Sequence, residues 1–404
     1  MTESNASRWK EISSSFLKMG ATAYGGPAMM GLMQAEFQER KQWVGKPRFL
    51  EGLALVNVLP GATAVQLGIF LGYARGGFLG GLLAGLCFAA PGLVVMLALT
   101  AAYATLGVSP VLRGALYGLG PVVLGIFVVA LYRLGRSALR ALPHRLIAVA
   151  AAAAALLSPL GTVAILLLTG GVGLFLFHGK RVGAVVLIVL AAVLALAPFV
   201  APPLVTAPAA VEQSPRLASV IGLFATIGAF TFGGGLSMIP LLEEHVVDRL
   251  QWLSPQEFIA GLALGQLTPG PLLIVAAYVG YKLLGLGGAL AAAAAVFLPS
   301  FVLMLAILPA FDRVRQLAWT RAVIQGIAPG VIGVMAVALV RMAPHAAPDP
   351  LAILVLIATV GVMLVWRLAP VKVILAGAVV GVVRDRLCQL PALRAALCLG
   401  AWGR

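Results

Sequence analysis

The residues best suited to chemistry are four breaks, rich in glycine or proline, that interrupt apolar segments. They are Gly25-Gly26-Pro27, Pro60-Gly61, Gly233-Gly234-Gly235 and Pro269-Gly270-Pro271. Each break frees backbone N–H groups, and N–H groups at a helix N-terminus attract an anion because the helix dipole is positive there. Three side chains beside the breaks, Thr63, Gln66 and Thr268, add neutral donors. The pattern predicts an anion site that avoids the cost of burying a Lys or Arg.

The breaks recur at matched positions in two halves of the chain. Residues 16–36 align with 224–244 at an offset of 208, and seven of the 21 positions are identical. Pro60-Gly61 matches Pro269-Gly270 at an offset of 209. One glycine pair is explained well enough by close helix packing. Four breaks at matched positions favour a substrate site instead, built where they converge.

Four charged residues are candidates for gating or coupling, namely Glu36, Arg113, Glu244 and Arg321. The two arginines recur at the offset of 208, as do Arg133 and Arg341, and they could gate an anion or snorkel at helix ends. The two glutamates follow the first break of each half, where a carboxylate could carry a coupling proton or face solvent. We favour the plainer interpretation of each, a snorkelling anchor and a solvated acid.

Composition places these residues in a membrane. Of 404 residues, 61% are apolar and only 10% are charged, against roughly 25% charged in soluble domains. The mean hydropathy of +1.05 predicts an all-α polytopic membrane protein that buries its residues against lipid. Runs that could serve as spanning helices are 78–106, 111–132, 161–178, 182–200, 287–309, 321–340, 350–366 and 371–383.

The net charge of +15 could indicate nucleic acid as a partner. The basic residues instead form short clusters between apolar runs, as cytoplasmic membrane loops do, so we expect no nucleic acid. Three cysteines form no CxxC pair and four histidines are scattered, which predicts no metal site. GxSxG, HExxH and Walker A motifs are missing, so we expect neither a cofactor nor an enzyme activity.

The repeat predicts a three-part organisation. An N-terminal repeat covers 1–181, a linking helix and Pro-rich linker cover 182–216, and a C-terminal repeat covers 217–404. The extra crossing at 182–200 would start the second half on the opposite side, which gives two inverted-topology repeats, as in many secondary transporters. If the four broken elements are re-entrant, most of the 28 Lys and Arg fall on the cytoplasmic side.

At these motifs the chain resembles the chromate ion transporter (CHR) family in its long, two-domain form. The first half reads AYGGPAMM and LPGATAVQLGIFLGYARGGFLGG, and the second reads FTFGGGLSMIP and LTPGPLLIVAAYVGYKLLGLGGAL. Each half thus carries an FGGP-like break and a PGP-like break, the latter followed by GY and a glycine-rich turn. The departures from the family pattern are Tyr24 for Phe, Ala62 and Gly235 for Pro, and Met29 and Met30 where many members carry His.

The resemblance implies a secondary transporter in the bacterial inner (plasma) membrane that exports chromate and confers chromate resistance. Export suits the physics, because a negative interior favours loss of an anion by about 2.3 kcal/mol per charge per 100 mV. Sulfate, a similar tetrahedral dianion, is the competing substrate. The alternatives are uptake or exchange of sulfate or another oxyanion, a lipid-linked phosphate carrier, and a non-transporting scaffold. A homodimer, the coupling ion and the side of the C-terminal tail stay open.

Overall fold

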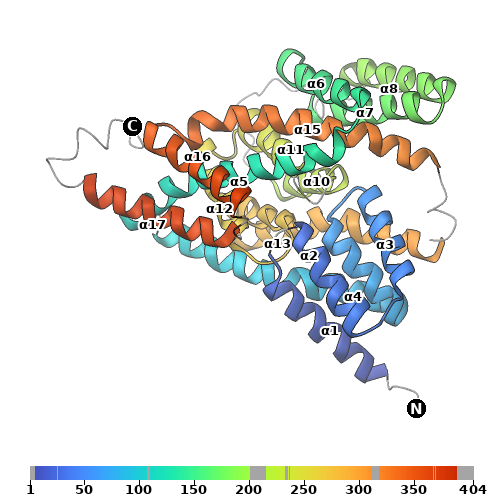
Figure 1. Ribbon diagram of the computed structural model, residues 1–404, viewed down its shortest axis with the longest axis horizontal. Helices are drawn as coiled ribbons and strands as arrows, with labels where there is room; N and C mark the ends of the chain where they lie inside the picture. Colours follow the sequence, from blue (N-terminus) through green and yellow to red (C-terminus); the bar gives the residue numbers. More distant parts are fainter. Residues whose placement is uncertain are drawn as a thin grey trace.

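The computed structural model describes residues 5–24, 26–106, 110–200, 215–232, 235, 237–310, 318–366, 368 and 370–388. Within these ranges every regular element is a helix (Figure 1). The first half holds α1 (Asn5–Thr22), α2 (Gly26–Met33), η1 (Gln34–Arg40), α3 (Lys46–Val58), α4 (Thr63–Leu106), α5 (Pro110–Ala138), α6 (Leu142–Leu157), α7 (Thr162–Phe177) and α8 (Lys180–Val200). The second holds α10 (Leu217–Ala229), α11 (Met238–Leu242), η2 (Glu243–Arg249), α12 (Pro255–Leu267), η3 (Leu272–Ile274), α13 (Val275–Ile307), η4 (Leu308–Ala310), α15 (Ala318–Ala346), α16 (Pro350–Val365) and α17 (Pro370–Cys388).

Apolar length confirms the prediction of an all-α polytopic membrane protein. Four helical stretches in the described ranges are long and apolar enough to cross a bilayer, namely Thr63–Thr105, Gly114–Ala138, Leu272–Ala310 and Trp319–Ala346. Residues 182–200, where the sequence predicts an extra crossing, lie in helix α8, which packs on α7. That this helix crosses the membrane stays a prediction. Most of the linker after it, residues 201–214, lies outside the described ranges.

Helix α4 is a hairpin of two helices. Its backbone turns at Gly76 and Gly77, where φ of Gly77 is +64°. A Cβ added at Gly72 would lie 2.4 Å from the Gly80 carbonyl oxygen, a contact that two positions eight residues apart in a straight helix could not make. The arm before the turn therefore runs back against the arm after it, which begins where the sequence predicts the span 78–106.

The second half repeats this geometry residue by residue. Helix α13 turns at Leu284 and Gly285 with nearly the same angles, and Gly280 there meets the Gly288 carbonyl as Gly72 meets Gly80. The two π-helices η1 and η2 also match at an offset of 209, and each is followed by a left-handed glutamine, Gln42 and Gln251. The duplication seen in the sequence is therefore a duplication of backbone conformation.

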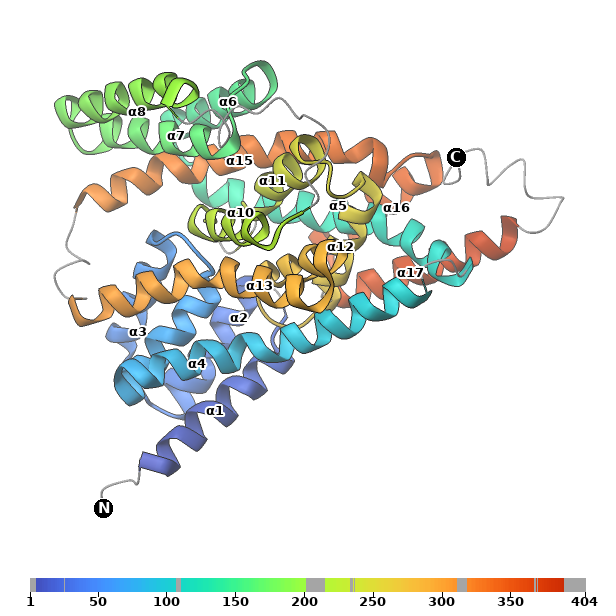
Figure 2. The same ribbon diagram turned by 180° about the vertical axis from the view of Figure 1, so that it is seen from behind.

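The two halves are intertwined. Helices α6 and α7 of the first half pack on α15 of the second, whereas α16 and α17 of the second half pack on α5 of the first. Figure 2 shows α6, α7 and α8 gathered along α15, with α17 lying along α5. Because α5 and α15 are matched helices and also touch each other, each half completes the packing of its counterpart.

The hairpin turns generate a stability prediction. Gly72→Ala places a methyl 2.4 Å from both the Gly80 carbonyl and the Ala84 Cβ, so the arms must separate. We expect a loss of about 1–3 kcal/mol of stability, the usual cost of overpacking. The control is Gly287→Ala, which meets nothing within 4 Å and should be neutral or stabilising because alanine favours helix. Thermal unfolding of the purified protein in detergent measures both, and equal melting temperatures would contradict the hairpin.

Candidate functional site

The second break of each half is hydrogen-bonded to the residue two positions before the first break of the other half. The Gly61 N–H donates to the Thr231 carbonyl at 2.6 Å, and the Gly270 N–H donates to the Ala23 carbonyl at 2.9 Å. Gly61 and Gly270 are matched positions in the repeat, as are Ala23 and Thr231. The two hydrogen bonds therefore exchange under an approximate two-fold operation that relates the halves.

Glycine is required at both donor positions. The φ angle is +124° at Gly61 and +97° at Gly270, values that residues with a Cβ rarely adopt. At Gly61 space is also lacking, because an added Cβ would lie 2.4 Å from the Ser300 Oγ and 2.6 Å from the Gln66 Nε2. The sequence motif is therefore explained by backbone conformation at both sites and by close packing at one.

One asymmetry between the halves explains the departure at Ala62. The Ala62 N–H donates to the Ser300 Oγ at 2.8 Å, and Ser300 is fully buried. The matched pair in the other half is Pro271, which has no N–H, and Gly92, which has no side chain. Ala62 stands where the PGP motif has its second proline, so its backbone has an N–H that proline lacks. Helix α13 supplies the Ser300 hydroxyl that accepts from this N–H. The sequence alone did not single out Ser300.

The first breaks are described only in part. Gly25, Gly233 and Gly234 lie outside the described residues, while Gly26 and Pro27 open helix α2. Gly235 is buried with φ of +94°, and an added Cβ there would meet Leu273. The Ser237 hydroxyl accepts from the Phe232 N–H at 2.6 Å and donates to the Phe232 carbonyl, which closes this turn.

The side chains expected to donate to an anion are buried, but two of them donate to backbone instead. The Gln66 Nε2 donates to the Pro60 carbonyl at 2.7 Å, and the Thr268 hydroxyl donates to the Leu264 carbonyl at 2.8 Å. A dry interior favours the nearest unpaired carbonyl, so both donors are engaged in this conformation. Their binding of an anion stays a prediction. The Gln66 Oε1 is buried with no partner among the described residues. Thr63 is buried at the start of α4.

The three gating candidates whose side chains the structure describes, Glu36, Glu244 and Arg321, take no part in these hydrogen bonds. Glu36 pairs with Arg40 on η1, and Glu244 pairs with Arg249 at 2.7 Å. Arg321 is exposed, and the Arg113 side chain lies outside the described residues. The two glutamates also do not occupy matched positions of the repeat. The Lys41 N–H donates to the Glu36 carbonyl, and the Leu250 N–H donates to the His245 carbonyl in the same way. Glu36 therefore corresponds to His245. One extra residue in the second half, before η2, moves the register there from 208 to 209.

The second arginine pair is a matched anchor. Arg133 donates to the Met363 carbonyl and Arg341 to the Ala155 carbonyl, each at 2.9 Å. Both carbonyls lie near the C-terminus of a helix of the opposite half, where the dipole favours a cation. Arg133 and Arg341 therefore act as anchors at helix ends. Each arginine also connects one half of the protein to the other.

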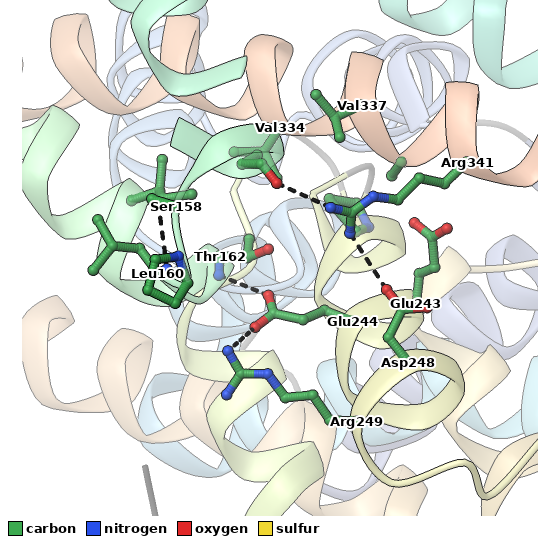
Figure 3. A pocket seen from close by; sticks show the side chains of 15 residues that line it. Ser158, Leu160, Thr162, Glu243, Glu244, Asp248, Arg249, Val334, Val337 and Arg341 are labelled. Atoms are coloured by element: carbon green, nitrogen blue, oxygen red, sulfur yellow. Dashed lines mark hydrogen bonds and ion pairs between the residues drawn. The ribbon is translucent and has the colours of Figure 1, made fainter. Parts of the chain in front are cut away.

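A separate polar cavity of about 190 Å³ lies between the loop joining α6 to α7, the π-helix η2 and helix α15 (Figure 3). Its charged lining residues are Glu243, Glu244, Asp248, Arg249 and Arg341. None of its lining residues belongs to a described part of a break. The cavity is thus distinct from the break contacts and brings Glu244 into a setting that the repeat alone did not predict.

The pairing of Ala62 with Ser300 predicts coupling between the two positions. Ser300→Gly leaves a buried N–H unpaired, which costs about 1–3 kcal/mol. Ala62→Pro alone places ring atoms where the Ser300 hydroxyl now lies, and should also destabilise. The double variant reproduces the Pro271 and Gly92 pair of the other half, so it should be more stable than either single variant. Chemical unfolding in detergent measures the cycle, and strictly additive losses would refute the coupling.

Comparison with known proteins agrees with this architecture. A family model described as chromate transporter matches residues 10–195 and again 218–382. The chromate transport protein of Cupriavidus metallidurans is 32% identical over 371 residues, which cover 90% of each chain. The chromate transport protein of Pseudomonas aeruginosa is 34% identical over 83% of this chain and 81% of its own.

A third relative, the probable chromate transport protein of Synechococcus elongatus, is 32% identical over 84% of this chain and 86% of its own. No solved structure matches the chain. The family model covers both halves and includes all four breaks, so the resemblance found at the motifs extends over nearly the whole sequence. The chain belongs to the chromate transporter family.

Proposed function

We propose that this protein carries chromate across the bacterial inner membrane, at the interface where the breaks of the two halves meet. The observation that supports the site is the exchanged pair of hydrogen bonds from Gly61 to Thr231 and from Gly270 to Ala23. Backbone N–H groups in a water-poor interior are strong donors, and a tetrahedral oxyanion offers several acceptors. Membership of the family supports transport of an oxyanion rather than catalysis.

In the proposed mechanism the opposite half and the substrate compete for the same donors. In the conformation described, the carbonyls of Thr231 and Ala23 accept hydrogen bonds from these N–H groups, so the N–H groups are not free to bind an anion. Movement of one half against the other separates donor from carbonyl and frees the N–H groups for the anion. Non-helical backbone at membrane depth must stay covered by protein or by a polar cavity. The exchange therefore requires that the substrate replaces the carbonyl as the acceptor for each N–H group.

The full proposed site consists of the four breaks and their polar neighbours. It comprises Gly25, Gly26, Pro27, Pro60, Gly61, Thr63, Gln66, Gly233, Gly234, Gly235, Thr268, Pro269, Gly270 and Pro271. The division at 1–181, 182–216 and 217–404 and the inverted orientation of the halves belong to the same proposal. Rocking of two inverted repeats about a central site is an established plan for secondary transporters.

Export is the proposed direction, and resistance to chromate is its consequence. For a dianion, a potential of 100 mV, negative inside, supplies about 4.6 kcal/mol toward the outside. No coupled ion is needed for that movement. Uptake of sulfate, the competing proposal, would have to overcome the same field. A homodimer stays a prediction that the site does not require.

Two alanine substitutions test the site. Gly61→Ala and Gly270→Ala force a Cβ onto backbone with positive φ, so both should lower chromate transport at least tenfold. Gly31→Ala is the matched control, because its Cβ meets nothing within 4 Å. The measurement is accumulation of radiolabelled chromate in everted vesicles with equal amounts of each protein in the membrane. Full transport in both variants would exclude the proposed site.

The same vesicles separate the proposed activities. Accumulation that requires an energised membrane and is absent from control vesicles would support export. Sulfate in excess should compete if the site accepts any tetrahedral dianion. No chromate accumulation, together with sulfate uptake in right-side-out vesicles, would contradict export and favour the competing proposal.

A further inference from the structure

The polar cavity beside η2 joins the two halves on one face of the molecule. The loop between α6 and α7 contributes Ser158 and Leu160 from the first half, and η2 and α15 line it from the second. It lies outside the four apolar spans except where α15 contributes Val334 and its neighbours. Any motion of one half against the other must change this contact.

Four of the five charged side chains in this cavity are paired. Glu244 accepts from the Thr162 N–H at 2.6 Å and lies 2.7 Å from Arg249. Asp248 lies 3.3 Å from Arg341, whose other nitrogen donates to the Ala155 carbonyl. Figure 3 shows these pairs as two separate sets, joined across the cavity by no further interaction. The two arginines are thus matched by two carboxylates.

Glu243 is the fifth charged residue, and it has no partner among the residues that the structure describes. Only 6% of its surface is exposed, and it makes no hydrogen bond or ion pair with any residue the structure describes. In Figure 3 its carboxyl lies near the Arg341 and Asp248 pair with no dashed line to either. A buried carboxylate without a partner is strongly disfavoured, whereas the neutral acid is not.

The charges facing Glu243 favour the neutral form. Asp248 and Glu244 on η2 repel a carboxylate, and Arg341 on α15 attracts it while already engaged by Asp248. Arg249 is held by Glu244, and His245 is turned to the Leu241 carbonyl. No charged residue lines the cavity from the α6–α7 loop. Burial, and then repulsion from Asp248, raise the pKa of Glu243 from 4.5 to about 8.

The repeat supplies a second, independent argument. The position of η1 that matches Glu243 at the offset of 209 is Gln34, which donates to Gln38 at 3.3 Å. Glutamine has the shape of a protonated glutamate and, like it, both donates and accepts hydrogen bonds. The first half therefore has a permanently neutral side chain at this position, whereas the second half has one only when Glu243 is protonated. Only one half therefore contains a group that can change its charge at this place.

We propose that Glu243 is a proton-binding site, occupied when the α6–α7 loop is packed on η2 and α15 and emptied when that contact opens. This site lies apart from the proposed oxyanion site and binds a different ligand. Ionised Glu243 would bring a third carboxylate into a cavity whose two arginines are already matched. Release of the proton therefore favours hydration of the cavity and separation of the loop. The link from this contact to transport rests on the proposed function, whereas the proton site itself does not.

The stability of the protein against pH tests the proton site directly. The folded state retains a proton that the unfolded state loses between pH 4.5 and about 8, so folding is most favoured below this window and weakens as pH rises through it. Glu243→Gln keeps the neutral shape and removes the titration. We expect the melting temperature of the wild-type protein in detergent to fall between pH 4.5 and about 8 relative to that of the variant. The two melting temperatures should converge below pH 4.5.

A matched control is Glu39→Gln, which removes an exposed acid from η1. Its pH profile should run parallel to that of the wild-type protein. Parallel profiles for Glu243→Gln and the wild-type protein would overturn the proposal. Infrared titration of the wild-type protein gives a second measurement in case the variant does not fold. A protonated carboxyl band that persists at neutral pH and disappears above about pH 8 supports the site, and its absence at neutral pH overturns it.

The two proposals fail separately. If the pH profiles are parallel while Gly61→Ala still abolishes chromate transport, the proton site is wrong and the oxyanion site stands. If Gly61→Ala transports normally while Glu243→Gln flattens the stability profile, the reverse holds. Transport by Glu243→Gln measured across the same pH range then shows whether the contact takes part in the transport cycle. A pH dependence identical to that of the wild-type protein would exclude that role.

Discussion

The structure depends on one constraint, that backbone groups freed inside a membrane must find partners in protein. Each half contains a break that it does not pair by itself, because the turn at Gly61 or Gly270 points its N–H away from its own helices. The partner is the carbonyl of Thr231 or Ala23 in the other half. An unpaired N–H in hydrocarbon costs several kcal/mol. The two halves are therefore bound to each other at the breaks, where their helices are interrupted.

The remaining contacts between the halves follow the same exchange. Helices α6 and α7 cover α15, α16 and α17 cover α5, and Arg133 and Arg341 each reach a carbonyl across the boundary. Exact symmetry is broken where the residues differ, as with Ser300 opposite Ala62 and Gly92 opposite Pro271. It is broken again at the cavity, where Glu243 stands in place of Gln34. Such differences between matched positions allow the two halves to have different functions.

Much of this could be predicted from the sequence, because glycine, proline and charge patterns act locally. The breaks, the repeat, the helices and the start of the arm at residue 78 follow from residue type and spacing. The partners across the boundary do not, since a repeat shows which positions match without showing which positions touch. Gln66 and Thr268 were expected to face an anion, and the structure gives their donors to backbone. Glu36 was matched with Glu244, and one extra residue in the second half places it opposite His245.

The proposed transport depends on separation of the two halves at the breaks. A disulfide between Ala62→Cys and Ser300→Cys tests it, in a background lacking Cys87, Cys388 and Cys398, because the Ala62 amide and the Ser300 hydroxyl are 2.8 Å apart. Chromate accumulation in everted vesicles should stop when the pair is oxidised and return when it is reduced, with the single-cysteine variants unaffected. Undiminished transport by fully cross-linked protein would show that the halves do not separate at the breaks during transport.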